Sequence, residues 1–420
     1  MPRKMKESGV EWLGQIPEGW EVCRVKDSFA YQKGLNITKA DLVDRGIFVI
    51  SYGQIHSKTN TGTYIGDGLL RFVPESFLES NAECLLKKND FVFADTSEDL
   101  DGLGNCAFCD RDDVIFAGYH TIVLRPTQTQ EWKYCAYLFK TDAWRSQFRS
   151  LAFGIKVFSL SQRLLNVCTF VLPPLPEQQR IAAFLDERCA KIDGMIAEAK
   201  ASIEDYKKWK QSIIFEAVTG KHEKNLKPSG IDWIGDVPEG WRMEVVKHLF
   251  SIVRGRVIAA TEVKGDGYPV YSSQTKNNGV MGYLDTYDFE RDQLTWTTDG
   301  ANAGAVFLRT GKYSCTNVCG MLSPKSADVN LSFVCYALGY VAFYNRRADI
   351  NGYKIMSNEM AEIRFPYPPV IDQRRIAAEL DEKCAAIDKF VGEKEALIAD
   401  LKAYKKSLIF ETVTGKREIA

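Results

Sequence analysis

The sequence has no long apolar run and no excess of positive charge. No stretch resembles the run of about 18 apolar residues that a membrane span requires, so we expect no membrane segment. The charged N-terminus is not followed by an apolar segment, so no secretory signal is expected. The net charge is −1, whereas a protein that binds duplex DNA alone is usually basic. Any contacts with phosphates must therefore come from local basic patches or from a partner.

Catalytic signatures are also missing. The chain has no Walker A motif, no glycine-rich cofactor loop, no Asn-Pro-Pro-Tyr motif of adenine methyltransferases, no Gly-x-Ser-x-Gly elbow and no His-Glu-x-x-His. We therefore expect no catalytic residue in this chain.

Metal-binding residues are scarce. The chain has four histidines, and Cys106-Ala-Phe-Cys109 is a lone pair with only His120 close by in sequence. A structural zinc site would need a second pair or nearby histidines, so buried thiols are the preferred interpretation and zinc is the alternative. The eleven scattered cysteines indicate reduced thiols in a cytoplasmic protein rather than a disulfide framework.

Two segments of the sequence each occur twice. Residues 8–20 (SGVEWLGQIPEGW) return at 229–241 as SGIDWIGDVPEGW, and residues 173–221 align without a gap on 368–416. By direct count, 28 of the 49 aligned positions in the second match are identical. Residues 21–172 and 242–367 show no comparable identity. The repeated unit is thus an entry motif, a variable block and a shared helix.

The shared segments predict long helices. Residues 177–218 contain no proline, and apolar residues recur at heptad spacing with Lys210 as a break, while Lys394 and Lys405 interrupt the second copy. A narrow apolar seam is unstable alone, so we expect the two copies to pair with each other, antiparallel about a pseudo-two-fold axis. About 38 residues give a rod of roughly 57 Å. The alternative is a pair of ordinary core helices in a compact domain.

Each variable block predicts an α+β domain. Short apolar runs read as strands, and helical stretches follow them near Trp132–Phe148 and Leu331–Tyr344. The predicted strands are 47–51, 91–94, 121–125, 269–271, 293–297 and 305–308.

Polar segments follow corresponding strands in the two blocks. They carry side chains that can bond base edges or phosphates, and these are our candidate DNA-binding residues. The candidates are Tyr52, Gln54, His56 and Lys58 in the first block, and Ser273, Gln274, Lys276 and Asn277 in the second. We add Asn302 from a glycine-rich loop, and Lys156 and Lys354 from turns before the shared helices. Solvated turns are the competing interpretation.

The order of these segments resembles the specificity subunits of type I restriction-modification systems. The resemblance rests on residues 12–20 and their copy at 233–241, and on the helix entries at 172–182 (LPPLPEQQRIA) and 367–377 (YPPVIDQRRIA). Segments 118–126 and 299–304 also resemble recurrent target-recognition segments. The second helix entry departs from the family pattern conservatively, with Val370-Ile371-Asp372 in place of Leu-Pro-Glu.

The resemblance implies four segments. These are target-recognition domain 1 (1–172), conserved helix 1 (173–221), target-recognition domain 2 (222–367) and conserved helix 2 (368–420). Each domain would read one half of a split double-stranded DNA site, and the antiparallel helix pair would hold the domains apart. Residues 173–221 and 368–420 would also bind the partners.

The expected partners are two methyltransferase subunits, which bind S-adenosylmethionine, and restriction subunits that use ATP and Mg²⁺ for translocation and cleavage; this chain would hold no cofactor. The helix residues expected to bind partners are Gln178, Arg180, Tyr206, Trp209, Gln373, Arg375 and Tyr404. The rival functions are a self-contained nuclease and a scaffold that never touches bases.

Overall fold

Two long helices, α7 (Leu175–Thr219) and α11 (Val370–Val413), each follow a globular domain. The computed structural model describes residues 3–151, 157–350 and 352–419. The chain divides into two compact units: unit 1 is residues 1–198 with 397–420, and unit 2 is residues 199–396. Each unit contains one domain and a stretch of both helices. We call residues 3–172 the first domain and residues 222–367 the second domain.

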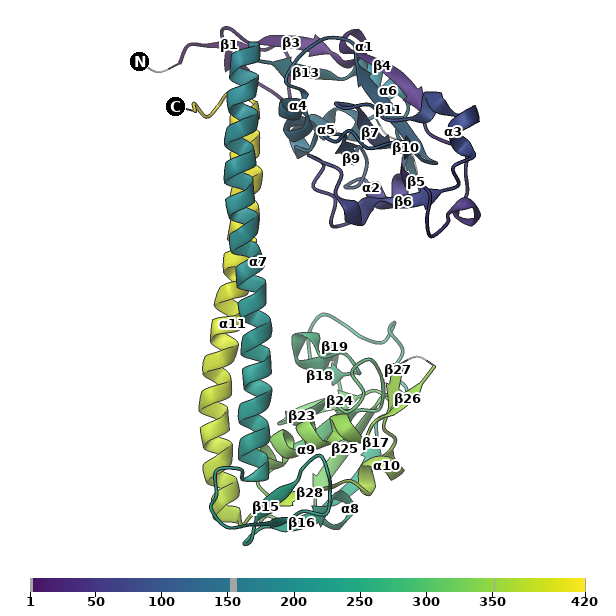
Figure 1. The fold of residues 1–420 in the computed structure, drawn as a ribbon. Helices are drawn as coiled ribbons and strands as arrows, with labels where there is room; N and C mark the ends of the chain where they lie inside the picture. Colours follow the sequence, from purple (N-terminus) through teal and green to yellow (C-terminus); the bar gives the residue numbers. More distant parts are fainter. Residues whose placement is uncertain (1–2, 152–156, 351, 420) are drawn as a thin grey trace. The chain divides into compact units, whose positions relative to one another are not determined.

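The first domain is built around an antiparallel sheet with the strand order β4-β11-β7-β9 (Figure 1). These strands are Phe29–Lys33, Thr121–Pro126, Phe91–Ala94 and Cys106–Phe108. All four residues of β7 are buried, because both faces of this central strand are covered. On one face Phe91 packs against Phe139, whose ring centroid lies 4.3 Å from that of Trp144. Burial of these large aromatic side chains contributes to the stability of the domain.

Smaller sheets complete the first domain. β5 (Ile47–Ile50) pairs in parallel with β10 (Ile115–Ala117), and β3 (Glu21–Arg24) pairs with β13 (Thr169–Leu172) next to α7. The other strands are β1 (Met5–Glu7), β2 (Gln15–Pro17), β6 (Arg71–Val73), β8 (Thr96–Ser97) and β12 (Phe158–Ser159). The helices are α1 (Val25–Ser28), α2 (Tyr52–Ile55), α3 (Phe77–Ser80), α4 (Trp132–Phe139), α5 (Asp142–Arg149) and α6 (Gln162–Val167).

The second domain repeats this topology although its sequence does not repeat. Its main sheet has the order β17-β25-β21-β23, and α9 (Leu331–Asn345) packs on β21 and β23 (Figure 1). The strands are Phe250–Arg254, Cys319–Pro324, Gln293–Thr297 and Val306–Arg309. Trp296 of β21 fills the space that a side chain at Gly320 would need, since a Cβ there would lie 2.0 Å from the indole ring. The shared topology confirms the predicted α+β class for both domains.

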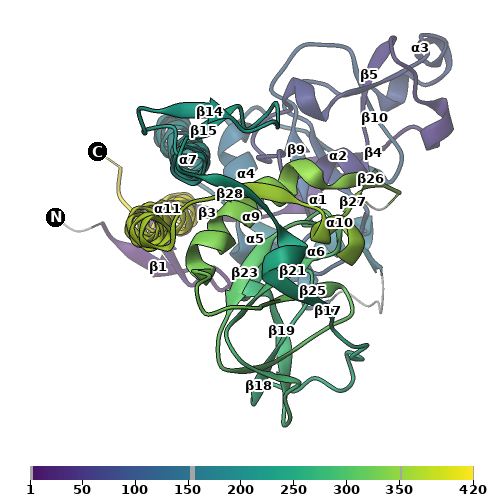
Figure 2. The same cartoon turned by 90° about the horizontal axis from the view of Figure 1, so that it is seen from below.

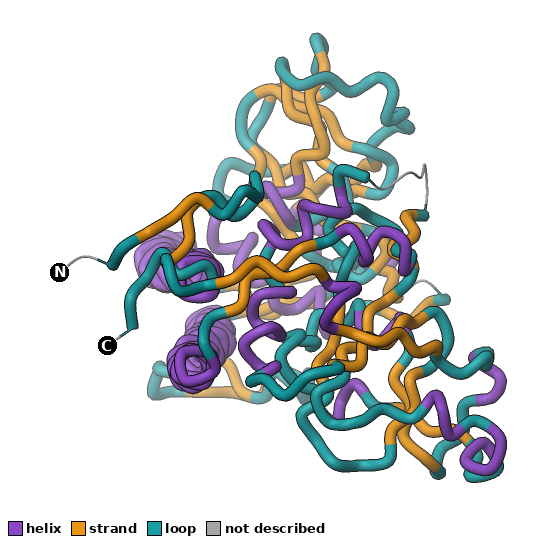
Figure 3. Tube along the Cα trace, turned by 90° about the horizontal axis from the view of Figure 1, so that it is seen from above, coloured by secondary structure: helices purple, strands orange, loops and turns teal. Residues whose placement is uncertain are grey.

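The remaining elements of the second domain also have counterparts in the first. β18 (Tyr268–Tyr271) pairs in parallel with β24 (Lys312–Cys315), as β5 does with β10. Figure 3 colours the strands orange and the loops and turns teal. The other strands are β14 (Leu226–Pro228), β15 (Asp236–Pro238), β16 (Arg242–Val245), β19 (Val280–Leu284), β20 (Phe289–Glu290), β22 (Asp299–Gly300), β26 (Arg347–Asp349), β27 (Gly352–Lys354) and β28 (Arg364–Tyr367). The short helices are α8 (Val246–Leu249) and α10 (Ser357–Ala361).

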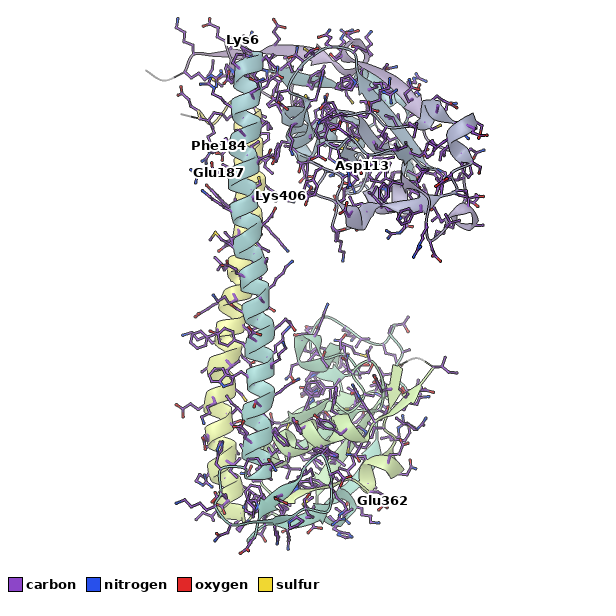
Figure 4. All side chains as sticks on the ribbon, viewed as in Figure 1. Lys6, Asp113, Phe184, Glu187, Glu362 and Lys406 are labelled. Atoms are coloured by element: carbon purple, nitrogen blue, oxygen red, sulfur yellow. The ribbon has the colours of Figure 1, made fainter. Side chains whose placement is uncertain are left out.

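In unit 1, the start of α7 packs against the end of α11. The seam residues Leu185, Cys189 and Ile192 are buried, as their heptad spacing predicts. Lys405, which interrupts the seam, places its Nζ 2.7 and 2.6 Å from the two carboxylate oxygens of Asp193. Lys406 lies beside it on α11 and pairs with Asp142 of the first domain at 3.6 Å (Figure 4). The seam-breaking lysine is therefore an inter-helix contact.

Unit 2 contains the equivalent contact made by the other copies of these residues. Nζ of Lys210 on α7 lies 2.6 and 2.7 Å from the carboxylate oxygens of Asp388 on α11. Next to this pair, the rings of Tyr206 and Phe390 stack with their centroids 5.8 Å apart. Residue numbers rise on one helix as their partners fall on the other, so the pair is antiparallel within each unit, and Figure 2 shows α7 and α11 side by side.

Each entry motif closes on the end of a long helix. In unit 1, Gly415 follows α11 with φ +72°, and a Cβ there would lie 2.4 Å from two ring carbons of Pro17. In unit 2, Gly220 follows α7 with φ +67° and meets Pro238 at the same 2.4 Å. Glycine is needed at both positions because the backbone is left-handed and the proline leaves no room for a side chain. The motif of each domain thus packs on the end of the other repeat's helix.

The structure refines the sequence predictions. The helical stretch near Trp132–Phe148 is two helices, because Thr141 caps a new start by accepting a hydrogen bond from the amide of Trp144. The helices α7 and α11 have 45 and 44 residues, which is longer than the rod of about 38 residues that we predicted. Among the described residues, none of the helices has the length and apolar content that crossing a bilayer requires.

Candidate nucleic-acid interface

In the first domain, the polar segment after β5 begins with a helical turn, α2. Ser51 is buried, and its amide donates to the side-chain oxygen of Gln54 at 3.2 Å, which closes a capping box around α2. Tyr52 and Gln54 are half-buried, while Lys58 is exposed beyond the turn. Of these candidates, Lys58 has the side chain most available to a phosphate or a base edge.

His56 has both ring nitrogens engaged inside the domain. Nε2 lies 2.8 Å from the carbonyl oxygen of Thr96, and Nδ1 lies 3.1 Å from the side-chain amide of Asn105. Because both ring nitrogens form contacts within the domain, neither is available to hydrogen-bond a base. The prediction that His56 contacts DNA is therefore replaced by a role in fixing the segment around it.

A recess of about 700 Å³ opens beside this turn, and Tyr52, His56, Asn105 and His120 lie on its wall. Three exposed carboxylates line it as well: Glu98, Asp99 and Asp101. Such a surface repels phosphate, but its carboxylates can accept hydrogen bonds from the exocyclic amino group of cytosine. The composition therefore suits contact with base edges better than contact with the backbone of DNA.

His120 lies at the rim of the recess in a strained conformation. Its φ is +54°, and its Nδ1 lies 3.2 Å from a carboxylate oxygen of Asp95. Its ring packs edge-on against that of Tyr52, with the centroids 5.4 Å apart. We considered His120 only as a zinc ligand, although segment 118–126 already resembled a recurrent target-recognition segment. The remaining candidate of this domain, Lys156, lies outside the described residues.

In the second domain, the structure brings the candidates from three segments together. The side-chain amide of Asn302 donates to the carbonyl of Ser273 at 3.3 Å, which joins the glycine-rich loop to the polar segment after β18. Lys354 of β27 lies opposite Asp299 of β22 in the same small sheet, and its Nζ is 2.6 Å from Asp349. Gln274, Lys276 and Asn277 are exposed. These segments form one polar surface that carries two lysines and the side-chain amides of Gln274 and Asn277, of which the Gln274 amide donates to the carbonyl of Val280.

The two helix glutamines are buried, which corrects our prediction that they bind a partner. Gln178 donates to the carbonyl of Pro173 at 2.7 Å and accepts from the amide of Glu131 at 3.0 Å. Gln373 makes the same pair of contacts, with Pro368 at 2.8 Å and Asn330 at 3.1 Å. Glu131 and Asn330 are the N-caps of α4 and α9. The glutamines thus lock each long helix to the helix of its own domain.

A second repeated contact strengthens this junction. The hydroxyl of Tyr137 donates to Asp186 of α7 at 2.6 Å, and that of Tyr336 donates to Asp381 of α11 at 2.8 Å. Burial raises the pKa of both tyrosines well above the ordinary value, and the neighbouring carboxylates add to the shift. Several helix residues that are identical in the two repeats therefore make contacts with their own domain.

The other predicted partner-binding residues lie on the helix surfaces. Arg180 and Arg375 are exposed, and Arg375 faces Asp372 at 3.2 Å. Trp209 is 54% exposed and Tyr404 is 50% exposed. Figure 4 shows the side chains that project from these helices. These two aromatic residues occupy equivalent positions of the repeat, one in each unit. The remaining candidate, Tyr206, is half-buried, and its ring stacks on that of Phe390.

The two cysteines of the C-x-x-C motif are buried around β9. Burial raises the pKa of Cys106 and of Cys109 to about 11 each, so the thiolate that zinc requires is disfavoured. In the described parts of the chain, no group of three or more histidine, cysteine or acidic side chains is placed to hold a metal ion. These thiols are packed as core residues.

Comparison with known proteins identifies relatives over most of the chain. The statistical model of the family described as "Type I restriction modification DNA specificity domain" matches residues 17–205 and 238–396. A protein of Mycoplasma pneumoniae named as a type I specificity subunit N-terminus is 40% identical over 140 residues, which is 32% of this chain and 74% of that protein. A protein of Methanocaldococcus jannaschii named as the MjaX type I restriction enzyme specificity subunit is 24% identical over 424 residues, covering 96% of this chain and 95% of that protein.

A solved structure shares the fold. It comes from work on the complex assembly and conformational transition of the type I restriction-modification system, and it aligns with a TM-score of 0.73 at 17% identity. The alignment covers 96% of this chain and 99% of that chain. The duplicated fold is therefore a feature that this chain shares with a known structure.

Proposed function

Since the chain belongs to the family of type I restriction-modification DNA specificity domains, we propose that it selects the target of a type I restriction-modification complex by reading a bipartite DNA site. Each domain reads one half of the site. Catalysis is supplied by partner subunits, and this chain directs it to the chosen sequence.

The observation that carries the proposal is a duplicated fold with two unlike polar surfaces. The main sheets of the two domains have the same strand order, and a polar segment follows the equivalent strand in each, β5 and β18. The first surface carries the carboxylates of Glu98, Asp99 and Asp101, whereas the second offers amides and lysines. Because base edges differ in their donors and acceptors, these two surfaces suit two different sequences.

The candidate base contacts follow from the exposed side chains on these surfaces. We assign Tyr52, Gln54 and Lys58 to the first half-site. The second half-site is assigned to Ser273, Gln274, Lys276, Asn277, Asn302 and Lys354. Amide side chains suit adenine, while lysines suit guanine or phosphate.

The helices supply docking positions for two methyltransferase subunits. Trp209 in unit 2 and Tyr404 in unit 1 are exposed and equivalent in the repeat, and tryptophan and tyrosine are frequent anchors of protein interfaces. We place S-adenosylmethionine on the methyltransferase subunits, and ATP and Mg²⁺ on the restriction subunits. Buried, unpaired cysteines support a reducing cytoplasmic location.

The test is a map of methylated adenines in cells that express the chain together with its methyltransferase subunits. We expect methylation at one split motif, and none at that motif when the chain is omitted. Methylation of the same sequences without the chain would contradict the proposal. Purified chain with duplex DNA and Mg²⁺ should leave the DNA uncut, because cutting by the chain alone would identify a nuclease.

A further inference from the structure

Each domain contains a buried arginine that reaches the polar surface of that domain. Arg309 of β23 is 2% exposed, and Arg145 of α5 is 7% exposed. Within residues 3–151, 157–350 and 352–419, neither guanidinium has a carboxylate oxygen within 4.0 Å of its nitrogens. A buried charge without a carboxylate is unfavourable, so its presence calls for a specific role.

Arg309 holds the polar segment of the second domain from beneath. Its Nη1 donates to the carbonyl of Asn278 at 2.7 Å, and its Nε donates to the hydroxyl of Thr295 at 3.1 Å. The guanidinium carbon lies 3.6 Å from the centroid of the Tyr271 ring, which covers its face. The side chain is therefore fixed by the core on one side and by the polar segment on the other.

The segment that Arg309 holds has an unfavourable backbone. Asn277 and Asn278 both have φ +49°, and Gly279 has φ +81°. Successive left-handed residues persist only when their surroundings impose them. A Cβ at Gly279 would lie 2.9 Å from Nη2 of Arg309, so the segment closes directly on the guanidinium. Without this anchor, Gln274, Lys276 and Asn277 would lose the fixed positions from which they face solvent.

Arg145 plays the corresponding part in the first domain through a relay. It donates to the carbonyls of Asp101 and Leu103 at 2.8 and 3.2 Å, and to the side-chain oxygen of Asn105 at 2.5 Å. The amide nitrogen of Asn105 then faces Nδ1 of His56 at 3.1 Å. The relay links the loop at 101–105 to the turn that carries Tyr52.

The polarity of this relay is set at both ends. Arginine can only donate, so the Asn105 oxygen accepts and its amide nitrogen donates to Nδ1 of His56. At the far end, the Thr96 carbonyl can only accept, so Nε2 of His56 carries the proton. The hydrogen bonds of this relay can all form in only one arrangement of donors and acceptors, and this arrangement fixes the shape of the recess.

The two arginines are not copies of each other. On β23, Arg309 pairs with Gln293 of the neighbouring strand β21. The equivalent position in the first domain is Cys109, whose backbone amide donates to the carbonyl of Asp90 beside the β7–β9 pair. Arg145 instead comes from a helix. An arginine required by the shared fold would recur at the same position, whereas each of these serves a surface that differs between the domains.

We propose that Arg145 and Arg309 are positioning residues of the two readers, each of which sets how sharply its own domain discriminates its half of the target. This inference rests on the proposed function. It assigns to each half-site one arginine that touches no base.

The test uses the full chain in complex with its methyltransferase subunits and measures kcat/KM for methylation. The duplexes carry the native site or a single substitution in one half. Arg309→Met should lower discrimination about tenfold or more at the half-site of the second domain and leave the other half unchanged. Arg145→Met should give the reciprocal result. Thr295→Val, which frees one side of Arg309 without touching the polar segment, should relax the same half-site by a smaller factor.

Arg125→Met is the matched control in the first domain. Arg125 is bonded to Asp90 and to the carbonyl of Leu85, away from the recess, so its loss should lower the melting temperature without relaxing either half-site. Wild-type discrimination in folded Arg309→Met and Arg145→Met chains would overturn the inference, as would equal relaxation of both half-sites. If the wild-type complex reads no bipartite site, the proposed function fails instead.

Discussion

The junction between the entry motif and the end of α11 makes a quantitative prediction for Gly415→Ala. The residue has φ +72°, and holding alanine in this left-handed region costs about 1–2 kcal/mol. The new Cβ would lie 2.4 Å from Cγ and Cδ of Pro17 and 3.2 Å from the ring of Trp20. Relief of such overpacking typically costs about 1–3 kcal/mol. Together these terms predict a loss of about 2–5 kcal/mol in the free energy of unfolding of unit 1.

Gly14→Ala is the matched control, because Gly14 has φ +64° with no atom within 4 Å of its virtual Cβ. It should show the backbone strain alone, about 1–2 kcal/mol. Urea unfolding followed by the fluorescence of Trp20 and its neighbours measures both variants. If Gly415→Ala destabilises the protein no more than Gly14→Ala does, the packing of Pro17 against the helix end is not as described.

Three further predictions concern the helices. A double-mutant cycle on Lys405 and Asp193, measured by urea unfolding, should give a coupling of about 0.5 kcal/mol, since both side chains are partly exposed; zero coupling would mean that the pair does not hold the register. Gln178→Leu should lower the free energy of unfolding by about 1–3 kcal/mol, because it leaves a buried amide and a buried carbonyl unpaired, while exposed Gln179→Leu should change it by less than about 0.5 kcal/mol. Equal effects of the two would argue against the buried lock. Inserting seven residues into each helix in heptad phase should lengthen the unread spacer by about 3 base pairs, as adenine methylation mapping would show; a constant spacer would show that the helices do not set it.

The helices were predictable because their signal is local and repeated. Heptad spacing predicted the buried seam of Leu185, Cys189 and Ile192. The sequence of one helix cannot show what Lys210 and Lys405 meet, since that depends on the register against the other helix. Their partners, Asp388 and Asp193, occupy equivalent positions of the repeat. The repeat therefore identified all four residues, but it could not show which lysine meets which aspartate.

The candidate site was less predictable because its contacts are non-local. Gln178 and Gln373 repeat, and repetition shows that a residue is constrained without showing whether it faces a partner or the core. His56 is a capable DNA ligand by type, but Thr96 and Asn105 occupy both of its nitrogens. Arg309 is separated from Asn278 by 31 residues, and neither lies in a motif. The polar segments could be predicted because each follows a predicted strand. The residues that hold these segments in place could not be predicted from the sequence.

The proposed function requires that the two domains read DNA independently. The decisive measurement exchanges residues 21–172 for the equivalent block of a relative, in the full chain with its methyltransferase subunits, and maps methylated adenines across a genome. We predict that one half of the methylated motif changes and the other half stays as it was. An unchanged motif would show that the first domain does not read DNA, and a change in both halves would show that the two domains do not read separately.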